Sequence, residues 1–527
     1  MLQMLFSAVA VLALAFGQPV EAQAAKRGGS LRVAIEGDAS NLDMVGGTGF
    51  PLKVYRETLG AGLLRLDENF QIIGDLAESW EISDEGRVIT FRLHPGGTYH
   101  DGAPLDAESV KWNLDLINGK VVPKWLEEIR SKNPKHAWRN NFLNYLYHID
   151  KVEVLNKYTV RVHQKNVGKA QTLDAMSSAF GKFTLASPAS YDRNIEQFLR
   201  RPAMSGPFKF VEWKRNQHLF AERHEGYFRK GLPYLDRIEF YFMPDANQRM
   251  NALLAGQIEV VNNLPLSLYE TMKKAPGVNV STGKATLNYS VPFHNQMDPW
   301  KDVRVRKAVA CYGVDRVQIV KTALRGLGTP WVSFSPAGAV DALDLTGECP
   351  YDPGKAKRLL AEAGYGPGKP LKFTLTTNNS DPAHLEVAQA LKLQLAQIGA
   401  EMEIQVVDYA TWNRAFIAQR RLQSTLQNTL SFRSANSNSH TIHSKSGIDY
   451  YNIKDPKVDE MLDAWRSTID PRKQLEFSHR LQRYLMEQAY YFNLASFPFV
   501  QAIRSDVKGF VNLGKLMLDY TEIWLDR

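Results

Sequence analysis

Apolar and polar residues alternate in several short runs, the pattern of strands with one buried face. These runs occupy residues 31–35, 88–94, 158–163 and 237–243. Residues 106–117 differ from them, because Val110, Leu114 and Ile117 recur at helical spacing. The chain therefore predicts an alternation of strands and helices.

The clearest unit spans residues 371–408. Apolar and polar residues alternate from 371 to 375, and Asp381 followed by Pro382 has the form of a helix N-cap and first turn. Gly399 is suited to the left-handed end of that helix, and a second strand pattern follows at 402–407. A strand, helix and strand of this length predict a right-handed crossover and a parallel pair. This half of the chain is therefore expected to be α/β.

The Asp-Pro pair recurs at Asp352, Asp455 and Asp470. An acidic metal-binding repeat is one interpretation, but helix capping explains both residues of each pair and is preferred. Residues 431–446 are rich in Ser and Asn and lack a strong period, which predicts a long loop. Long loops in compact domains often carry function.

Composition changes this picture little. The 527 residues exceed the span of one hydrophobic core, so at least two domains are expected. Lys and Arg total 64 against 56 Asp and Glu, a net charge of +8 without a dense basic run, so nucleic acid is not an expected partner. Cys311 and Cys349 are the only thiols, and the sequence leaves open whether they are bonded or free.

The N-terminus predicts a signal peptide. Residues 2–16 are apolar but shorter than the roughly 20 residues of a membrane span, and Ala22-Gln23-Ala24 follows as a small-x-small triplet. Cleavage is expected after Ala24. No Cys lies near that site, so a protein exported to the periplasm without a lipid anchor is expected.

Catalytic and metal motifs are absent from the sequence. It contains no G-x-S-x-G, H-E-x-x-H or G-K-[ST] motif, and the Gly-rich residues 46–49 do not complete G-x-G-x-x-G. His440 and His443 are spaced as a helical metal pair, but they lie in the expected loop and are interpreted as solvated. We therefore expect no enzyme activity, catalytic residue, metal or cofactor.

Several motifs together resemble the family 5 extracellular solute-binding proteins, the peptide-, nickel- and opine-type receptors of ABC importers. The motifs are A-E-S-W-E-I-S-D-E-G at 77–86, T-F-R-L-H at 90–94, Y-H-D-G-A-P-L-D-A-E-S-V at 99–110, S-G-P-F at 205–208, D-P-W-K-D-V-R-V-R-K-A at 298–308, G-V-D-R at 313–316 and the segment 351–364. Their order and spacing match the family over nearly all of the chain after residue 24.

The resemblance implies an α/β, two-lobed periplasmic-binding-protein (Venus-flytrap) fold with an extra subdomain in the first lobe. The implied divisions are 1–24 as signal peptide, 25–64 with 205–291 and 489–527 as the lobe I core, 65–204 as the extra subdomain, and 292–488 as lobe II. Two hinge segments, near 286–294 and 490–499, would let the lobes close around a ligand.

Residues expected to line the ligand site come from the same resemblance and from position along the chain. They are Met44, Gly46, Gly47, Thr48, His294, Asn295, Phe432, Arg433, Ser434 and Asn436. In peptide-binding relatives, an aromatic residue and an Asp that pairs with the peptide ammonium occupy the loop at 429–446. Phe432 takes the aromatic role, but this loop has no acid, and Arg433 suits a carboxylate or phosphate instead. The alternative is that Arg433 points into solvent.

The expected function is the periplasmic substrate-binding component of an ABC importer, with a small solute and the permease and ATPase subunits as partners. The solute is expected to be a peptide or peptide-like compound. The alternatives are an anionic solute such as an opine or sugar conjugate, or a metal chelate that would use His440 and His443. A secreted hydrolase and a chemosensory adaptor are the alternatives of other classes. A monomer is expected.

Overall fold

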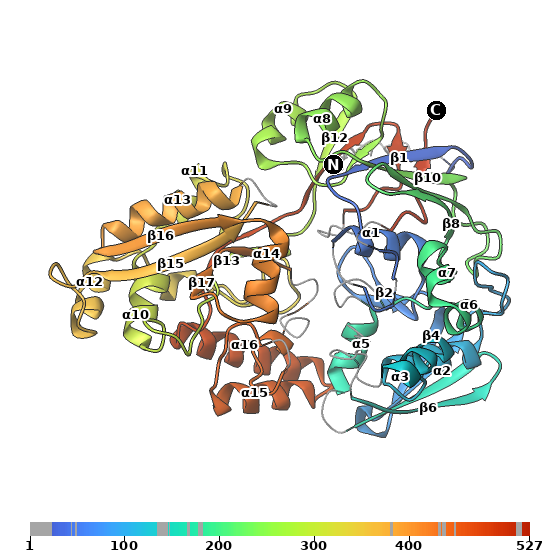
Figure 1. Cartoon of the computed structure of the whole chain (residues 1–527), viewed down its shortest axis with the longest axis horizontal. Helices are drawn as coiled ribbons and strands as arrows, with labels where there is room; N and C mark the ends of the chain where they lie inside the picture. Colours follow the sequence, from blue (N-terminus) through green and yellow to red (C-terminus); the bar gives the residue numbers. More distant parts are fainter. Residues whose placement is uncertain are drawn as a thin grey trace, which may run out of the picture.

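The computed structural model describes residues 24–527 except 40, 44, 48–49, 134–145, 147, 166–168, 178–182, 380–382, 431–433, 435–438, 447–448 and 513–518. Two lobes stand side by side (Figure 1). The right-hand lobe in that view contains both described ends of the chain, and we call it lobe I. The left-hand lobe, lobe II, is built from the later elements between β13 and β19.

A seven-stranded sheet organises the core of lobe I, in the order β12-β20-β11-β1-β10-β9-β8. The strands are β1 (Ser30–Ile35), β8 (Phe208–Lys214), β9 (His218–Arg223), β10 (Arg237–Phe242), β11 (Val260–Val261), β12 (Val278–Thr282) and β20 (Val500–Arg504). The central strand β1 is parallel to both β10 and β11, whereas the other pairs are antiparallel. Strands from both ends of the chain therefore share one core. Around it lie α1 (Phe50–Leu59), α8 (Ala246–Leu254), α9 (Tyr269–Lys273) and the hairpin of β21 (Val507–Lys508) and β22 (Trp524–Leu525).

A second sheet in lobe I, in the order β4-β5-β7-β6, is antiparallel throughout. Its strands are β4 (Ala77–Ser83), β5 (Val88–Leu93), β6 (Ile149–Asn156) and β7 (Thr159–Gln164). Helix α2 (Ala107–Ile117) packs on β6 and β7, and Asp106 caps it through the Ser109 amide. Around this sheet lie β2 (Leu64–Leu66), β3 (Ile72–Gly74), α3 (Lys124–Lys132), α5 (Lys169–Ser177), α6 (Pro188–Arg193) and α7 (Ile195–Arg200).

Lobe II contains the α/β unit that the sequence predicts. Strands β15 (Leu371–Asn378) and β16 (Ala400–Val407) pair in parallel and are joined by α13 (Ala383–Ala396). Gly399 has φ +83°, the left-handed conformation expected after that helix. Asp381 and Pro382 lie outside the described residues. The other lobe II strands are β13 (Leu287–Ser290), β14 (Thr329–Pro330), β17 (Ser424–Thr425), β18 (Gln427–Leu430) and β19 (Asn493–Phe497).

The Asp-Pro pairs act as helix caps, as predicted. Asp352, Asp455 and Asp470 each accept a backbone N–H of the first turn, and the following Pro occupies the start of the helix. These helices are α12 (Pro353–Glu362), α15 (Pro456–Arg466) and α16 (Pro471–Glu487). The other lobe II helices are α10 (Val303–Lys307), α11 (Arg316–Thr322) and α14 (Tyr409–Asn413).

Two motif arginines are buried in lobe II, where backbone carbonyls accept their hydrogen bonds. Arg306 donates to the carbonyls of Trp300, Lys301 and Gln488. Arg316 donates to the carbonyls of Ala310 and Asn493, and burial lowers its pKa to about 9. These hydrogen bonds tie the segments around α10 and α11 to the start of β19. The R-V-R and V-D-R motifs therefore have a structural role here.

The structure settles the question that the sequence left open about the two cysteines. Cys311 and Cys349 form a disulfide, with their Cα atoms 4.6 Å apart. Both are buried beside Val332 and Leu345 in a small apolar cluster. The disulfide joins the turn after α10 to the segment that leads into α12.

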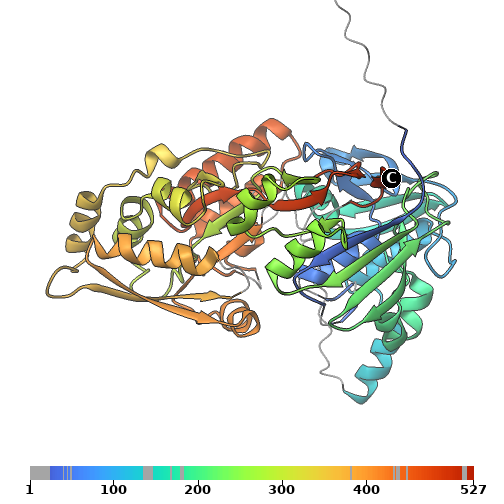
Figure 2. The same cartoon turned by 90° about the horizontal axis from the view of Figure 1, so that it is seen from above.

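Two short segments carry the chain between the lobes, one from β12 to β13 and one from β19 to β20 (Figure 2). Phe499 belongs to the lobe II core, whereas Val500 packs in lobe I. The strands β13 and β19 pair with each other, so the two segments run close together. The domain limits and hinge segments expected from the sequence stay predictions.

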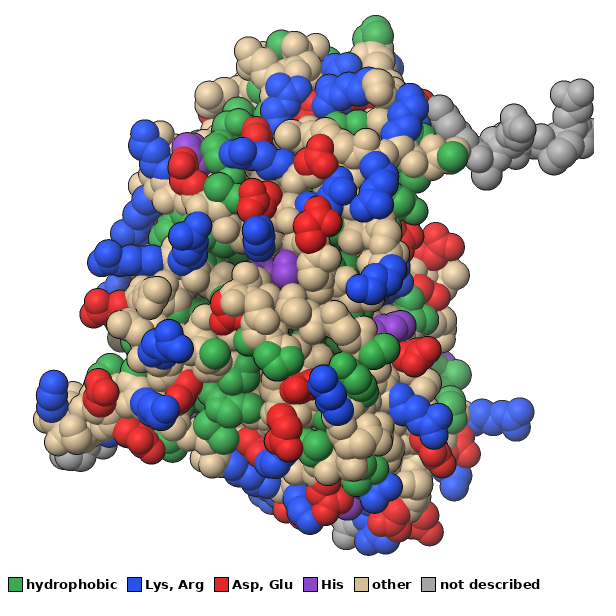
Figure 3. Space-filling view, turned by 90° about the vertical axis from the view of Figure 1, so that its right-hand side faces the viewer, with side chains coloured by type: hydrophobic (Ala, Val, Ile, Leu, Met, Phe, Trp, Pro, Cys, Tyr) green, Lys and Arg blue, Asp and Glu red, His purple; other side chains and the backbone are tan. Residues whose placement is uncertain are grey.

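The outer face of lobe I shows basic and acidic side chains interspersed (Figure 3). Among the described residues, no helix combines the length and the apolar character that crossing a bilayer requires.

Candidate functional site

The two lobes also meet at the end opposite the connecting segments. There α5 of lobe I packs against α15 of lobe II (Figure 1). We call the surfaces of lobe I and lobe II that face each other, between this contact and the connecting segments, the inter-lobe face. A solute held there would contact both lobes, which makes this face the candidate functional site.

Polar groups form the contact at α5 and α15. The hydroxyl of Ser434, in lobe II, donates to Oδ2 of Asp174 on α5 at 3.4 Å, and both residues are buried. Arg466 of α15 donates to Oγ of Ser439, which also belongs to lobe II, at 2.8 Å. Burial is the main reason that the pKa of His148 in lobe I is lowered to about 3, and the positive charge of Arg466 is the second. Charged and polar groups of the two lobes are thus withdrawn from water together.

The glycine turn before α1 forms part of lobe I. Asp43 accepts the amides of Val45 and Gly46 at 3.1 and 2.8 Å, and its main-chain carbonyl accepts Gly47 N–H at 2.9 Å. Arg56 of α1 donates to the Gly47 carbonyl at 2.9 Å. A Cβ on Gly47 would lie 2.5 Å from the Asp43 carbonyl oxygen, which leaves no room for a side chain. The turn is therefore fixed against α1.

Gly47→Ala should destabilise the turn and disturb the inter-lobe face. The new methyl group would also lie 2.4 Å from Cδ2 of Leu52, so α1 or the turn must shift, at about 1–3 kcal/mol. The melting temperature and the affinity for solute should both be lower than in the wild type. Gly368→Ala is the control, because nothing lies within 4 Å of a Cβ there. Equal melting temperatures and affinities for the two variants would contradict the fixed turn.

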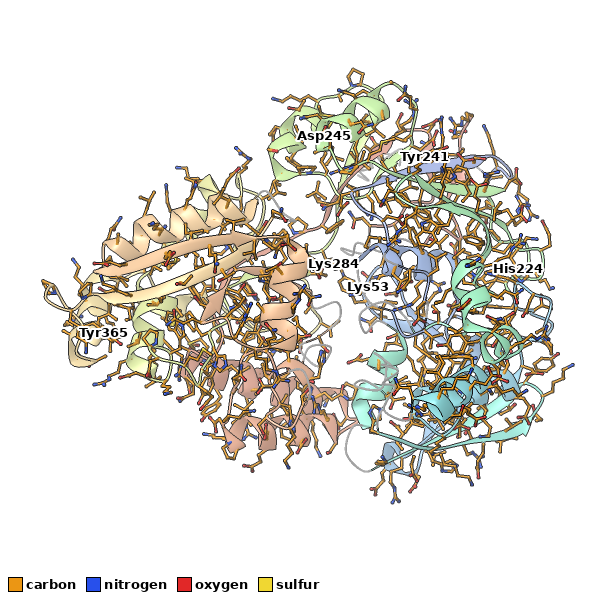
Figure 4. All side chains as sticks on the ribbon, in the orientation of Figure 1. Lys53, His224, Tyr241, Asp245, Lys284 and Tyr365 are labelled. Carbon is orange, nitrogen blue, oxygen red and sulfur yellow. A yellow bond between two sulfur atoms is a disulfide. The ribbon has the colours of Figure 1, made fainter. Side chains whose placement is uncertain are left out.

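Lys53 lies on α1, on the side of lobe I that faces lobe II (Figure 4). Its side chain is half-buried, and burial, aided by the neighbouring charge of Arg56, lowers its pKa to about 7. Burial also lowers the pKa of Arg56 to about 10.

His294 and Asn295 follow β13 in lobe II. The main chain of His294 donates to the Gln423 carbonyl, and burial lowers the pKa of its half-buried imidazole. Asn295 is buried and donates through Nδ2 to the Tyr451 carbonyl at 2.9 Å. The hydrogen bonds that Asn295 donates to Phe293 and Tyr451 stay within lobe II, and the roles of both residues in binding stay predictions.

The interpretation of His440 and His443 as solvated loop residues is wrong. Both are buried, at 3% and 8% exposure, because α15 packs over them. His443 lies 3.6 and 3.4 Å from Asp459 and Asp463 of that helix, and burial lowers the pKa of His440 to about 3. Within the described residues, no group of three His, Cys, Asp or Glu is arranged to hold a metal ion.

Several predicted site residues cannot be placed. Met44, Thr48, Phe432, Arg433 and Asn436 lie outside the described residues, so their roles stay predictions. Of the expected residues that the structure describes, Ser434 touches the other lobe, and Gly46 and Gly47 form the turn beside α1.

Sequence reasoning missed Lys53 and Arg56 in lobe I, and Asp174 and Arg466 at the contact between the lobes. A signal did exist for the first pair, since two cations three residues apart follow the glycine turn directly. Asp174 and Arg466 are almost 300 residues apart in the chain and carry no local pattern.

Comparisons with known proteins agree with this architecture. The model of the bacterial extracellular solute-binding proteins, family 5, matches residues 71–447. The glutathione-binding protein GsiB of Pectobacterium atrosepticum is 28% identical over 347 residues, which is 66% of this chain and 63% of that protein.

Solved structures show the same fold. The oligopeptide-binding protein AppA of Bacillus subtilis, in complex with a nonapeptide, has a TM-score of 0.80 at 23% identity and covers 96% of this chain and 100% of its own. AgaA of A. tumefaciens R10, in complex with agropinic acid, has a TM-score of 0.80 at 24% identity, with 95% and 99% covered. The family match extends over more than half of the chain, and the two-lobed fold expected from the sequence is confirmed. The chain belongs to the family 5 bacterial extracellular solute-binding proteins, which bind solutes and are not enzymes.

Proposed function

We propose that this protein is the periplasmic receptor of an ABC importer, and that it captures a small peptide-like solute by closing its two lobes. Residues 1–24 would direct its export, and the permease and ATPase subunits would receive the solute. The observation that carries the proposal is the contact of the lobes at two ends of the inter-lobe face, through the connecting segments and through α5 with α15. Such a face encloses a solute only while the lobes are together, which is the requirement for closure driven by binding.

A tripeptide or a related compound is the preferred solute. The GsiB relative is named for glutathione, and the AppA structure holds a peptide. Glutathione carries two carboxylates, and Lys53 lies on the side of lobe I that faces lobe II (Figure 4). An anionic non-peptide solute is the second candidate, because the AgaA structure holds agropinic acid.

The proposal is tested by thermal unfolding of protein that has been unfolded and refolded to remove any carried ligand. The panel contains glutathione, di- to pentapeptides, opines, organic acids, sugars and nickel chelates. A ligand at 100 times its Kd should stabilise the fold by about 2.7 kcal/mol, which raises the melting temperature measurably. Stabilisation by glutathione or short peptides supports the proposal. Stabilisation by opines alone moves the solute class to the second candidate, and no stabilisation by any member contradicts both.

A further inference from the structure

Lobe I holds the first connecting segment as far as Gly283. Strand β12 pairs with β20 along its whole length. Asn512 of lobe I donates through Nδ2 to the carbonyls of Ser281 and Phe499, at 3.0 and 3.2 Å. The Gly283 amide donates to the Phe499 carbonyl at 3.4 Å, which joins the two connecting segments to each other. The contacts with lobe I therefore extend to the residue before Lys284.

Lobe II holds the same segment from Ala285 onward. The Ala285 carbonyl accepts the Gly338 amide at 2.7 Å and the Ser496 hydroxyl at 3.2 Å. A Cβ on Gly338 would lie 2.8 Å from the main-chain nitrogen and oxygen of Ala285 and 2.9 Å from Cβ of Lys284, so this fit is close. Lys284 is therefore the residue at which the chain changes from lobe I to lobe II, and its Cβ lies beside lobe II.

The far end of the Lys284 side chain contacts lobe I. Figure 4 shows Lys284 where the chain passes between the lobes. Its ammonium lies 5.0 Å from the centroid of the Phe70 ring, which is within the range of a cation–π contact. A single side chain thus begins beside lobe II and ends over a ring of lobe I.

Phe70 is held in an unusual conformation in the turn between β2 and β3. Its neighbours at positions 68, 69 and 71 are exposed, whereas Phe70 itself is 0% exposed. Its φ of +60° lies in the left-handed region, which bulky side chains seldom adopt. Such strain persists only where surrounding contacts hold it, and it is concentrated at binding and switch regions. The turn therefore presents a fixed ring to the connecting segment.

We propose that Lys284 is the pivot of the hinge and that its contact with Phe70 stabilises the closed state. The contact is present in a structure in which α5 and α15 of the two lobes also touch. Rotation about the backbone of Lys284 would carry lobe II, with Gly338 and the Lys284 Cβ, away from the Phe70 ring. The proposal rests on the capture by closure given above, and it makes Lys284 a positioning residue and not a group that binds the solute.

The test compares Lys284→Met, which keeps the length of the side chain but removes the charge, with Phe70→Leu and with the double variant. Calorimetry and stopped-flow dissociation use glutathione, or the panel member that stabilises the wild type most. Lys284→Met should bind about 2- to 5-fold more weakly, because binding includes closure and the open state lacks the contact. The loss should appear in the dissociation rate, since the contact forms as the lobes close.

The double variant separates a role in closure from direct contact with the solute. In the Phe70→Leu background, Lys284→Met should cause no further loss of affinity, because the ring that it acts through is already absent. Lys284→Arg should bind as the wild type does, since a guanidinium also stacks on an aromatic ring. Lys372→Met is the control, because its side chain is 69% exposed on β15. Circular dichroism confirms that each variant is folded.

The outcomes distinguish the role of Lys284 from the receptor function. Wild-type affinity in Lys284→Met overturns the proposal and leaves the receptor function standing. The same follows if Lys284→Met weakens binding equally in the wild-type and Phe70→Leu backgrounds, because Lys284 then acts without the ring. If no member of the panel binds to the wild type, the receptor function is contradicted, and the proposed role in closure with it.

Discussion

Acidification from pH 7 to pH 5 should remove a large part of the stability of the fold. His148 and His440 are buried and His100 is half-buried, and burial, as the largest cause, lowers the pKa of each to about 3. In the unfolded chain a histidine titrates near 6.5. Between these pKa values the unfolded state binds protons that the folded state does not bind, so the free energy of unfolding falls as pH falls. The loss is about 2 kcal/mol for each histidine over this range, against a typical total of about 5–15 kcal/mol.

The measurement is thermal or denaturant unfolding at pH 7, 6, 5 and 4, with circular dichroism at pH 7 to confirm folding. The double variant His148→Gln with His440→Gln should lose about two thirds of the slope that the three histidines contribute. These two histidines lie near Arg466, so their protonation also opposes the contact of the lobes. An identical pH dependence in wild type and variant would show that the histidines are not buried as neutral groups.

Removal of the disulfide is the second change with a large expected effect. The bond joins positions 38 residues apart, and the chain-entropy relation gives a loss of about 4 kcal/mol for the double variant Cys311→Ala with Cys349→Ala. The physical reason is that the unfolded chain regains the freedom of a closed loop. The sites are buried, so the lost sulfur contacts act in the same direction.

Thermal unfolding with and without a reductant checks this expectation. The wild type should melt several degrees lower in reductant, and the variant should melt at a low temperature that reductant does not change. If the variant melts at the wild-type temperature, or if reductant lowers both equally, the bond does not contribute as described.

Local patterns predicted much of the fold because they have local causes. Each Asp-Pro cap depends on one side chain and the next few backbone amides. The unit of β15, α13 and β16 depends on the spacing of apolar residues and on one glycine. These features can be found in a single sequence. The burial of His440 and His443 could not, because α15 covers them and lies beyond the loop in the chain.

The site was only partly accessible to the same reasoning. The glycine turn has a local origin, since a Cβ on Gly47 would lie 2.5 Å from the Asp43 carbonyl oxygen. By contrast, the contact of Ser434 with Asp174 joins the two lobes across 260 positions of sequence. Residues that act between lobes are therefore the ones that need a structure.

Small-angle X-ray scattering on the refolded protein tests solute capture by closure most directly. The protein is measured alone and with increasing glutathione, or with the panel member that stabilises it most. The radius of gyration should decrease and saturate with the same Kd that calorimetry gives, because a solute that contacts both lobes favours the closed state. Saturable binding with an unchanged radius of gyration would contradict it.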